Sequence, residues 1–342
     1  MTQTVEGSEQ ADGQLPPVGP LPPYDPEFDA GLAAMQAQGF LPPPLTSAEQ
    51  IPVLRAWMTQ AFAVTDDELT RNGAYTLEER QVPGPAGAPE ITLLIVRPAA
   101  ADTARPVIYH THGGGMVVGG RRDGVPGMLD LAEPSGAAVV SVEYRLAPEH
   151  PHPAPVEDCY AGLKWTAEHA EELGLDADRI VIAGASAGGG LAAATALLAR
   201  DEGGPALLGQ MLICPMLDDR NDTASARQSY DKGTWSGLGN HVGWTALLGD
   251  RKGSADLSPV ASASRATDVS GLPPALLDVG SAEVFRSETV AYAERIWQAG
   301  GVAELHVWPG GFHGYDMFVP QSPVSQATVR ARRDWLGRIL SS

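Results

Sequence analysis

Short apolar runs rich in β-branched residues recur along most of the chain and predict strands. They occupy residues 91–96, 106–109, 137–144, 179–183, 210–214, 275–279 and 304–308. Helix-like patterns separate most of them, at residues 156–173, 188–200, 287–299 and 324–340. Several of the strands are almost continuously apolar, as expected of strands covered on both faces. The alternation predicts an α/β fold, with a mostly parallel central sheet flanked by helices.

The N-terminal part of the chain precedes this alternation. Residues 1–24 are polar and rich in proline and glycine, so we expect them to be mobile at their start. Residues 25–75 open with two amphipathic helical patterns, the second with Thr46 or Ser47 as its N-cap. Because these helices come before any strand, we interpret them as part of a cap rather than of the sheet.

A second segment, residues 217–256, interrupts the alternation with a long polar stretch that carries Trp235 and Trp244. We interpret it as an insertion that joins the N-terminal helices to form a helical cap. The core would then consist of residues 76–216 and 257–342.

Composition narrows the classes of function. The 342 residues carry 42 Asp and Glu against 23 Lys and Arg, a formal net charge of −19. This charge repels phosphate backbones and anionic membranes, so we expect no nucleic-acid partner and a small neutral substrate. No apolar run is long enough to span a bilayer and no signal-peptide pattern is present, so we expect a soluble, cytoplasmic protein without stable membrane insertion. Two cysteines, Cys159 and Cys214, are too few for a disulfide framework.

A serine stands between an apolar strand and an Ala-rich helix, in the motif Gly184-Ala-Ser186-Ala-Gly188. A serine at such a turn adopts a cramped backbone conformation, which requires small flanking residues. The turn would expose the Ser186 hydroxyl at the edge of the sheet, close to a helix N-terminus that favours developing negative charge. The pattern favours a nucleophile over a purely structural glycine-rich turn.

A glycine run, His112-Gly-Gly114-Gly115, directly follows another predicted strand. Backbone N–H groups can stabilise an oxyanion only where no side chain blocks close approach, and glycines allow that approach. A phosphate-binding loop would need a Gly-Lys-Ser/Thr sequence, which is absent. We expect His112 to hold the loop through hydrogen bonds rather than to act as a base.

His313 lies in the glycine-rich sequence WPGGFHG, straight after the last predicted strand. A serine hydroxyl needs a base whose pKa is near 7 within hydrogen-bond reach. The order along the chain, nucleophile first and histidine last, fits the α/β-hydrolase arrangement. The pair His150 and His152 has no third ligand nearby in sequence, so we expect no metal site there.

The acid that would orient this histidine is less clear from the residues alone. Glu283 lies three residues beyond Gly280, on the loop after the strand at 275–279, where it could reach His313 or could be an ordinary exposed acid. Asp278 is the competing residue. It lies inside the strand, so its side chain should point into a face of the sheet.

Together these motifs resemble the hormone-sensitive-lipase-like family (bacterial family IV) of α/β-hydrolase serine esterases. The resemblance rests on HGGG, the segment at 144–159, G-x-S-A-G-G, LPPALLDVG and GGFHG, in that order. It implies a helical cap and an oxyanion hole formed by Gly114, Gly115 and Ala187. It also favours Glu283, which stands where the family has its acid.

The sequence departs from the family pattern at three places. Ala185 replaces a common Asp before the nucleophile, and Gly190 stands where Asn is common. The acid loop carries Ser281 and Glu283, where many relatives have two aspartates. A Ser-His-Glu triad still works, because the acid only orients the imidazole and stabilises its charged form.

We therefore predict a carboxylic ester hydrolase for short to medium acyl chains. Ser186 would attack the ester, His313 would act as base and then as acid, and Glu283 would orient it; no cofactor or metal is needed. An amidase, carbamate hydrolase or lactonase with the same triad remains open, as does a non-catalytic ligand-binding protein on a hydrolase scaffold. The oligomeric state also stays open, and a homodimer paired at an edge strand would be compatible with the sequence.

Overall fold

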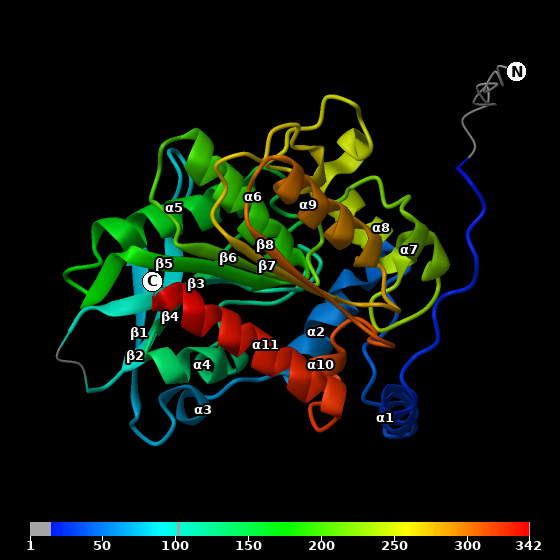
Figure 1. Cartoon of the computed structure of the whole chain (residues 1–342), viewed down its shortest axis with the longest axis horizontal. Helices are drawn as coiled ribbons and strands as arrows, with labels where there is room; N and C mark the ends of the chain where they lie inside the picture. The colour runs from blue at the N-terminus through cyan, green and yellow to red at the C-terminus, as the bar shows by residue number, and fades with distance from the viewer. Residues whose placement is uncertain (1–14, 101–102, 342) are drawn as a thin grey trace, which may run out of the picture.

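One sheet forms the centre of the molecule (Figure 1). Within residues 15–100 and 103–341, which the computed structural model describes, eight strands pair in the order β1-β2-β4-β3-β5-β6-β7-β8. They are β1 (Tyr75–Val82), β2 (Ile91–Pro98), β3 (Arg105–Thr111), β4 (Ala138–Glu143), β5 (Leu175–Ala185), β6 (Gly209–Ile213), β7 (Ala275–Gly280) and β8 (Ala303–Trp308). β2 is antiparallel to β1 and β4, and all other pairs are parallel. The predicted α/β fold with a mostly parallel sheet is confirmed.

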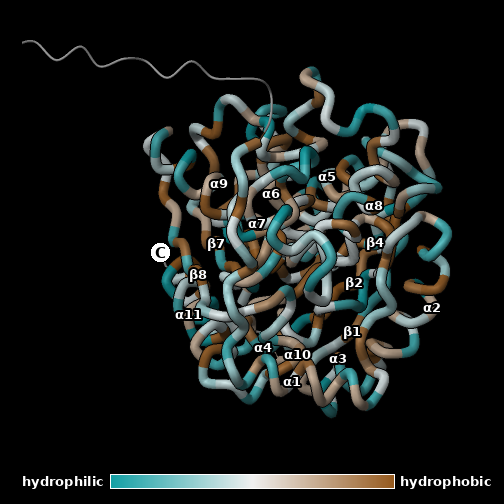
Figure 2. Tube along the Cα trace, turned by 90° about the vertical axis from the view of Figure 1, so that its right-hand side faces the viewer, coloured by the Kyte–Doolittle hydropathy of each residue, from teal (hydrophilic) through white to brown (hydrophobic). Residues whose placement is uncertain are grey.

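Helices cover both faces of the sheet (Figure 1). One face carries α5 (Ala154–Glu168), α6 (Ala187–Asp201) and α9 (Arg286–Gln298), and the other carries α4 (Val125–Ala132) and α11 (Pro323–Leu340). The strands between the helical layers are rich in buried apolar residues, and apolar residues are brown along the tube of Figure 2. The described helices include none that is long and apolar enough to cross a lipid bilayer.

The apolar runs of the sequence do not predict β1. This edge strand buries only its two ends, Tyr75 and Val82, and its polar and charged residues between them are exposed or half-buried. An edge strand needs little apolar surface because only one of its sides is paired. β1 is fixed by its antiparallel register with β2, and not by its own hydrophobicity.

The N-terminal helices lie close to where they were expected. They are α1 (Pro26–Ala37), the 3-10 turn η1 (Ala48–Gln50), α2 (Ile51–Ala61) and the short α3 (Asp66–Thr70). Of the two proposed caps, Ser47 is the N-cap of η1, and its backbone N–H donates to Oε1 of Gln50 at 3.1 Å; the N-cap of α2 is Gln50 itself. The predicted mobile start falls on residues 1–14, outside the described residues. After it, the carbonyl oxygens of Pro16 and Pro20 accept hydrogen bonds from the insertion.

α1 packs on the loop that carries His313. The ring of Phe28 lies 5.9 Å from that of Phe312, edge to face, and 4.9 Å from that of Tyr315. These three residues and Val319 form a small apolar cluster apart from the main core. The backbone N–H of Asp25 donates to the carbonyl of Gly310 at 3.2 Å. Two segments from opposite ends of the chain thus form one unit beside the site, where the loop is joined by α10 (Tyr315–Phe318).

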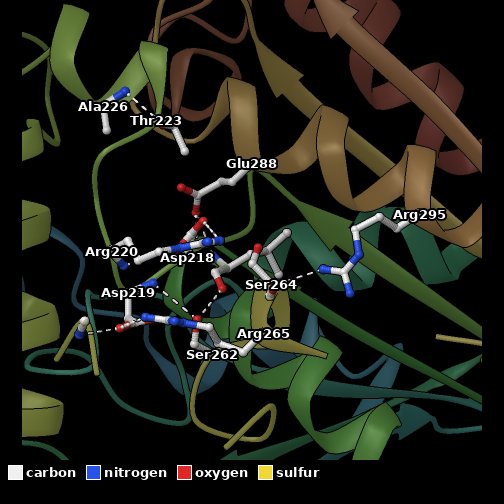
Figure 3. A network of polar contacts seen from close by, with 12 residues as sticks. Asp218, Asp219, Arg220, Thr223, Ala226, Ser262, Ser264, Arg265, Glu288 and Arg295 are labelled. Carbon is white, nitrogen blue, oxygen red and sulfur yellow. Dashed lines mark hydrogen bonds and ion pairs between the residues drawn. The ribbon is translucent and has the colours of Figure 1, made fainter. Parts of the chain in front are cut away.

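Residues 217–256 contain α7 (Ala224–Gln228), α8 (Gly237–Leu248) and the 3-10 turn η3 (Gly249–Arg251). Two further 3-10 turns lie outside this segment, η2 (Glu133–Ser135) between α4 and β4 and η4 (Ala263–Arg265) before β7. Polar contacts hold the start of residues 217–256 against residues 262–265 and against α9 (Figure 3). Arg265 forms two bonds to the buried carboxylate of Asp219, at 2.7 and 3.0 Å. The Ser262 hydroxyl donates to the carbonyl of Leu217 at 2.8 Å. Glu288, from α9, accepts the backbone N–H of Leu217 at 2.7 Å. A buried network of hydrogen bonds and one ion pair therefore fixes the start of this segment.

Candidate active site

The carboxyl ends of the parallel strands bring the predicted site residues to one edge of the sheet. Ser186 directly follows β5, and Glu283 lies three residues after β7. His313 lies five residues after β8. Ligand sites in open α/β sheets form at this edge, because the connecting loops all start there.

Ser186 occupies a strained turn between β5 and α6. Its φ and ψ are 58° and −123°, a backbone conformation that residues with side chains rarely adopt. The turn is held by two backbone bonds, from Ser186 N–H to the Ile213 carbonyl at 2.8 Å and from Met216 N–H to the Ser186 carbonyl at 2.9 Å. A Cβ atom added at Gly188 would lie 2.0 Å from the Thr111 carbonyl oxygen, so only glycine fits there. The surroundings over-determine the strain and keep the hydroxyl in place.

The side chains of Ser186, His313 and Glu283 form one hydrogen-bonded chain. Nε2 of His313 lies 3.1 Å from Oγ of Ser186, and Nδ1 lies 2.6 Å from Oε2 of Glu283. With the proton on Nδ1, the imidazole donates to the carboxylate, and Nε2 is free to accept the serine proton. The arrangement can perform nucleophilic catalysis with a general base.

Glu283 is buried rather than an exposed loop acid, with 3% of its surface accessible. Its second oxygen, Oε1, accepts the backbone N–H of Gly280 at 3.0 Å. Both carboxylate oxygens therefore have fixed partners. Asp278 lies apart, buried against Arg332, as expected of a residue that points into a face of the sheet.

Two neighbours of the histidine escaped the sequence analysis. The ring of Phe285 packs edge to face on His313 at 5.2 Å. Cys214 offers a thiol whose sulfur lies within 4.8 Å of donor atoms of both Glu283 and His313. Burial raises the pKa of this thiol, so it is neutral. The available signal was position, because Cys214 directly follows β6 and so lies at the same edge of the sheet.

These three donors do not form a ready metal site. Nδ1 of His313 and Oε2 of Glu283 are 2.6 Å apart, a hydrogen-bond distance. Two ligands of one tetrahedral zinc ion would lie roughly 3.3 Å apart, given bonds of about 2.0–2.1 Å. The pair would have to separate before an ion could enter.

The glycine loop after β3 lies against the nucleophile turn. Gly114 and Gly115 have positive φ values of 114° and 60°. Within residues 15–100 and 103–341, the backbone N–H of neither glycine donates a hydrogen bond. A third N–H, that of Ala187, opens α6, and first-turn N–H groups of a helix have no partner in the helix. These three donors could bind an oxygen that becomes negatively charged.

His112 holds this loop, as predicted. Its Nδ1 lies 2.8 Å from the Gly113 carbonyl, and its ring stacks on Tyr144 at 4.0 Å. The Tyr144 hydroxyl donates to the carbonyl of His112 at 2.8 Å. Burial lowers the pKa of His112 to about 4, so the ring is neutral at pH 7.

The departures from the family pattern have local structural counterparts. A Cβ atom at Gly190 would lie 2.1 Å from the Met216 carbonyl oxygen, so the turn as built here excludes a side chain. The hydroxyl of Ser281 accepts the backbone N–H of Gly310 at 2.8 Å and so links the acid loop to the histidine loop. Nothing in the structure explains why Ala185 replaces aspartate.

Comparison with known proteins points to one group. Residues 108–317 match a family model described as the alpha/beta hydrolase fold. The carboxylesterase NlhH of Mycobacterium tuberculosis is 37% identical over 295 residues, which is 84% of this chain and 90% of that protein. The esterase LipI of the same species is 36% identical over 73% of this chain and 78% of its own length. Among solved structures, a bacterial heroin esterase has a TM-score of 0.84 and 37% identity, covering 93% of this chain and 98% of its own.

Proposed function

This chain belongs to the α/β-hydrolase fold family, among its hormone-sensitive-lipase-like esterases, and we propose that Ser186, His313 and Glu283 are the catalytic triad with which it hydrolyses carboxylic esters. The protein is an ester-hydrolysing enzyme. The triad, the oxyanion hole and the range of short to medium acyl chains are the proposal.

Acylation begins when Oγ of Ser186 attacks the ester carbonyl carbon while its proton passes to Nε2 of His313. The carbonyl π electrons move to oxygen, which becomes an oxyanion. Glu283 stabilises the imidazolium that forms, without taking its proton. The imidazolium then gives the proton to the leaving alkoxide, and the C–O bond breaks to leave an acyl-enzyme. Water repeats the sequence with the same base, so that the carboxylic acid is released and Ser186 regains its proton.

The backbone N–H groups of Gly114, Gly115 and Ala187 would bind the oxyanion. Two observations support this assignment of the oxyanion hole. Among the described residues, the N–H groups of the two glycines have no other acceptor, and Ala187 is the first residue of α6. Removing one such donor typically costs about 10²–10³ in kcat.

We also propose the helical cap, formed by residues 25–75 and 217–256. Its support is contact between the two segments: a Cβ atom added at Gly239, in α8, would lie 3.5 Å from the carbonyl oxygen of Leu45. The insertion also reaches the site, because the Thr234 hydroxyl donates to the carbonyl of His313.

A cytoplasmic location and a homodimer complete the proposal. Both cysteines are free thiols, as is usual in reducing compartments. β8 is an edge strand of the sheet and could pair with its equivalent in a second copy. Light scattering of the purified protein at several concentrations tests the homodimer, and the mass of a monomer at every concentration would contradict it.

The position of the His313 imidazole between Ser186 and Glu283 carries the proposal. The test compares wild type with Ser186→Ala on p-nitrophenyl esters from C2 to C16, with intact-mass detection of labelling by a fluorophosphonate. In wild type we expect the rate of hydrolysis to be highest for an acyl chain shorter than C12, and one fluorophosphonate label per chain. In Ser186→Ala we expect neither hydrolysis nor labelling. An optimum at C12 or longer overturns the acyl range, and labelling of Ser186→Ala means another nucleophile.

The same panel separates the alternative functions. Amide, carbamate and lactone substrates use the same oxyanion hole, so faster turnover of one of them than of any ester would reassign the preferred bond. A wild-type protein that ignores esters and the fluorophosphonate would be a binding protein on this scaffold.

A further inference from the structure

A cavity of about 390 Å³ lies between the N-terminal helices and the insertion. One wall consists of residues of α1, of the loop that follows it and of α2, including Leu32, Ala33, Leu45 and Leu54. The opposite wall is the loop at 231–236 of the insertion, with Gly239 behind it. Its size lies within the range of small-molecule pockets, which starts at about 300 Å³.

The indole of Trp235 lines this cavity and lies against the glycine loop. A Cβ atom added at Gly115 would lie 2.3 Å from Cη2 and 2.4 Å from Cζ2 of the Trp235 ring, so the ring rests directly on that glycine. Its Nε1 is buried and has no hydrogen-bond partner in the described part of the chain. The ring is therefore held by packing rather than by a polar contact.

Two residues of the cavity lining also contact loops of the proposed active site. The neighbouring residue, Thr234, lines the cavity and bonds to the backbone of His313. On the other side, the glycine loop reaches the nucleophile, because a Cβ atom at Gly113 would lie 3.6 Å from Cβ of Ser186. Trp235 thus contacts both the cavity and the glycine loop that lies against the nucleophile.

We infer that the cavity receives the larger group of the ester and that Trp235 is a specificity-determining residue, whose ring sets how long a group the enzyme accepts. This inference rests on the proposed function. The chain-length preference follows from the space between Trp235 and the wall formed by α1, because each added methylene must find room and apolar contact there.

The lining also defines the chemistry of the accepted group. Leucine and proline are the commonest residues in it, and Asp29 and Asp231 are the charged residues among those that line it. Apolar, uncharged alkyl or aryl groups gain contact in such a space. An anionic group would meet two carboxylates without a basic partner among these residues, and would be disfavoured.

The experiment measures kcat/KM for two ester series, one that varies the acyl chain of p-nitrophenyl esters and one that varies the alcohol of acetates. In Trp235→Ala, we expect the ratio of the longest to the shortest substrate to rise roughly tenfold in one series, which also tells whether the cavity holds the acyl or the alcohol group. Trp235→Phe keeps an aromatic wall and should shift the ratio less. Active-site titration with a fluorophosphonate corrects each rate for the fraction of folded enzyme.

A second variant changes the opposite wall of the cavity, so the inference can still be tested if Trp235→Ala does not fold. Ala33 is exposed on α1 and lines the cavity, so Ala33→Trp should fill it and lower the same ratio. Trp297→Ala is the matched control, because Trp297 is 44% exposed on α9 and does not line the cavity. If neither Trp235→Ala nor Ala33→Trp shifts the ratio while ester hydrolysis persists, the inference is wrong and the proposed function stands. Absence of ester hydrolysis in wild type would instead overturn the proposed function.

Discussion

Arg332 lies buried against Asp278, with Nε 2.6 Å from one carboxylate oxygen and Nη2 3.1 Å from the other. The same guanidinium donates to Asp316, three residues beyond His313. Desolvation raises the pKa of Asp278, but the ion pair opposes this shift. Asp278 therefore ties β7 to the histidine loop and the C-terminal helix, and its carboxylate is fully engaged there.

The two acids should consequently respond differently to removal of their charge. Glu283→Gln should lower kcat by up to roughly 10⁴ with little change in KM, because an amide favours the wrong imidazole tautomer. Asp278→Asn should lower mainly the free energy of unfolding, since it removes one of the two carboxylates that pair with the buried Arg332 and leaves Asp316, a loss of up to about 3–5 kcal/mol. Steady-state kinetics and urea unfolding of both variants make the comparison. The opposite outcome, with the kinetic collapse in Asp278→Asn, would assign the acid to Asp278.

The steric requirement for glycine at position 190 can be tested directly by substitution. Gly190→Ala places a methyl group 2.1 Å from the Met216 carbonyl oxygen, so the backbone that also holds Ser186 must shift. We expect a loss of about 1–3 kcal/mol of stability, as for overpacked cores, together with a lower kcat. Gly337→Ala, in α11 with nothing within 4 Å, is the control and should stabilise by about 0.5–1 kcal/mol. Equal effects of both substitutions on Tm and kcat would argue against the steric explanation.

Glu288 should make stability depend on pH. Burial raises the pKa of this carboxyl well above its ordinary 4.5, because its Oε2 has no partner in the described structure and its charge is costly there. The folded state thus prefers the protonated form. Its contribution to stability is complete below about pH 4.5 and is lost as the pH rises toward the raised pKa.

Glu288→Gln should remove this pH dependence of stability because an amide does not titrate. Its amide oxygen can still accept the backbone N–H of Leu217, so the hydrogen bond is kept. We expect its Tm to gain on wild type as the pH rises from 5 to 9, measured by thermal unfolding. Glu288→Ala should instead cost about 1–3 kcal/mol across the range, because it leaves backbone donors unsatisfied. A constant Tm difference between Glu288→Gln and wild type would show that the group does not titrate there.

Phe28 should influence catalysis although it belongs to α1. Phe28→Ala removes the ring that packs on Phe312, and should loosen the loop of His313 and lower kcat at least several-fold. Val53→Ala, at a site 58% exposed on α2, is the control and should change little. Hydrogen exchange across residues 310–319 would report the loosening, and unchanged exchange with a lower kcat would require another route.

Truncation extends this test to the whole N-terminal segment. Deleting residues 1–60 should expose the cluster of Phe312 and Tyr315 and damage activity, most for bulky esters. Deleting residues 1–20 should change little, because Arg227 and Gln228 bind the backbone carbonyls of its described part at the surface, where water can replace them. Equal activity of the two truncations across the ester panel would refute the cap.

The sequence predicted the central strands because burial on both faces leaves an uninterrupted apolar run. It did not predict β1, since pairing with β2 and not side-chain burial holds that strand. α4 was missed for a related reason: its first turn contains Pro126 and Gly127, which are poor helix formers in isolation. In both elements tertiary contacts override local preference.

The site shows the same division. Short motifs located Ser186, His313 and the glycine loop, because strained turns and close backbone approach require particular small residues at fixed positions. Glu283 had no such local signature, and Trp235 lies in a segment without periodicity. Their places depend on how the loops after different strands meet, which is a property of the assembled edge of the sheet.

The pairing of α1 with the histidine loop also sets the order in which the protein can be completed during synthesis. Phe28 precedes all eight described strands along the chain and is synthesised before them, whereas Phe312 and Tyr315 follow them. Until then its ring has no native partner in this cluster, and such exposed apolar surface attracts chaperones or other nascent chains. The ring of Phe28 therefore waits for the loop of His313 to be synthesised, and one contact then buries Phe28 and supports that loop.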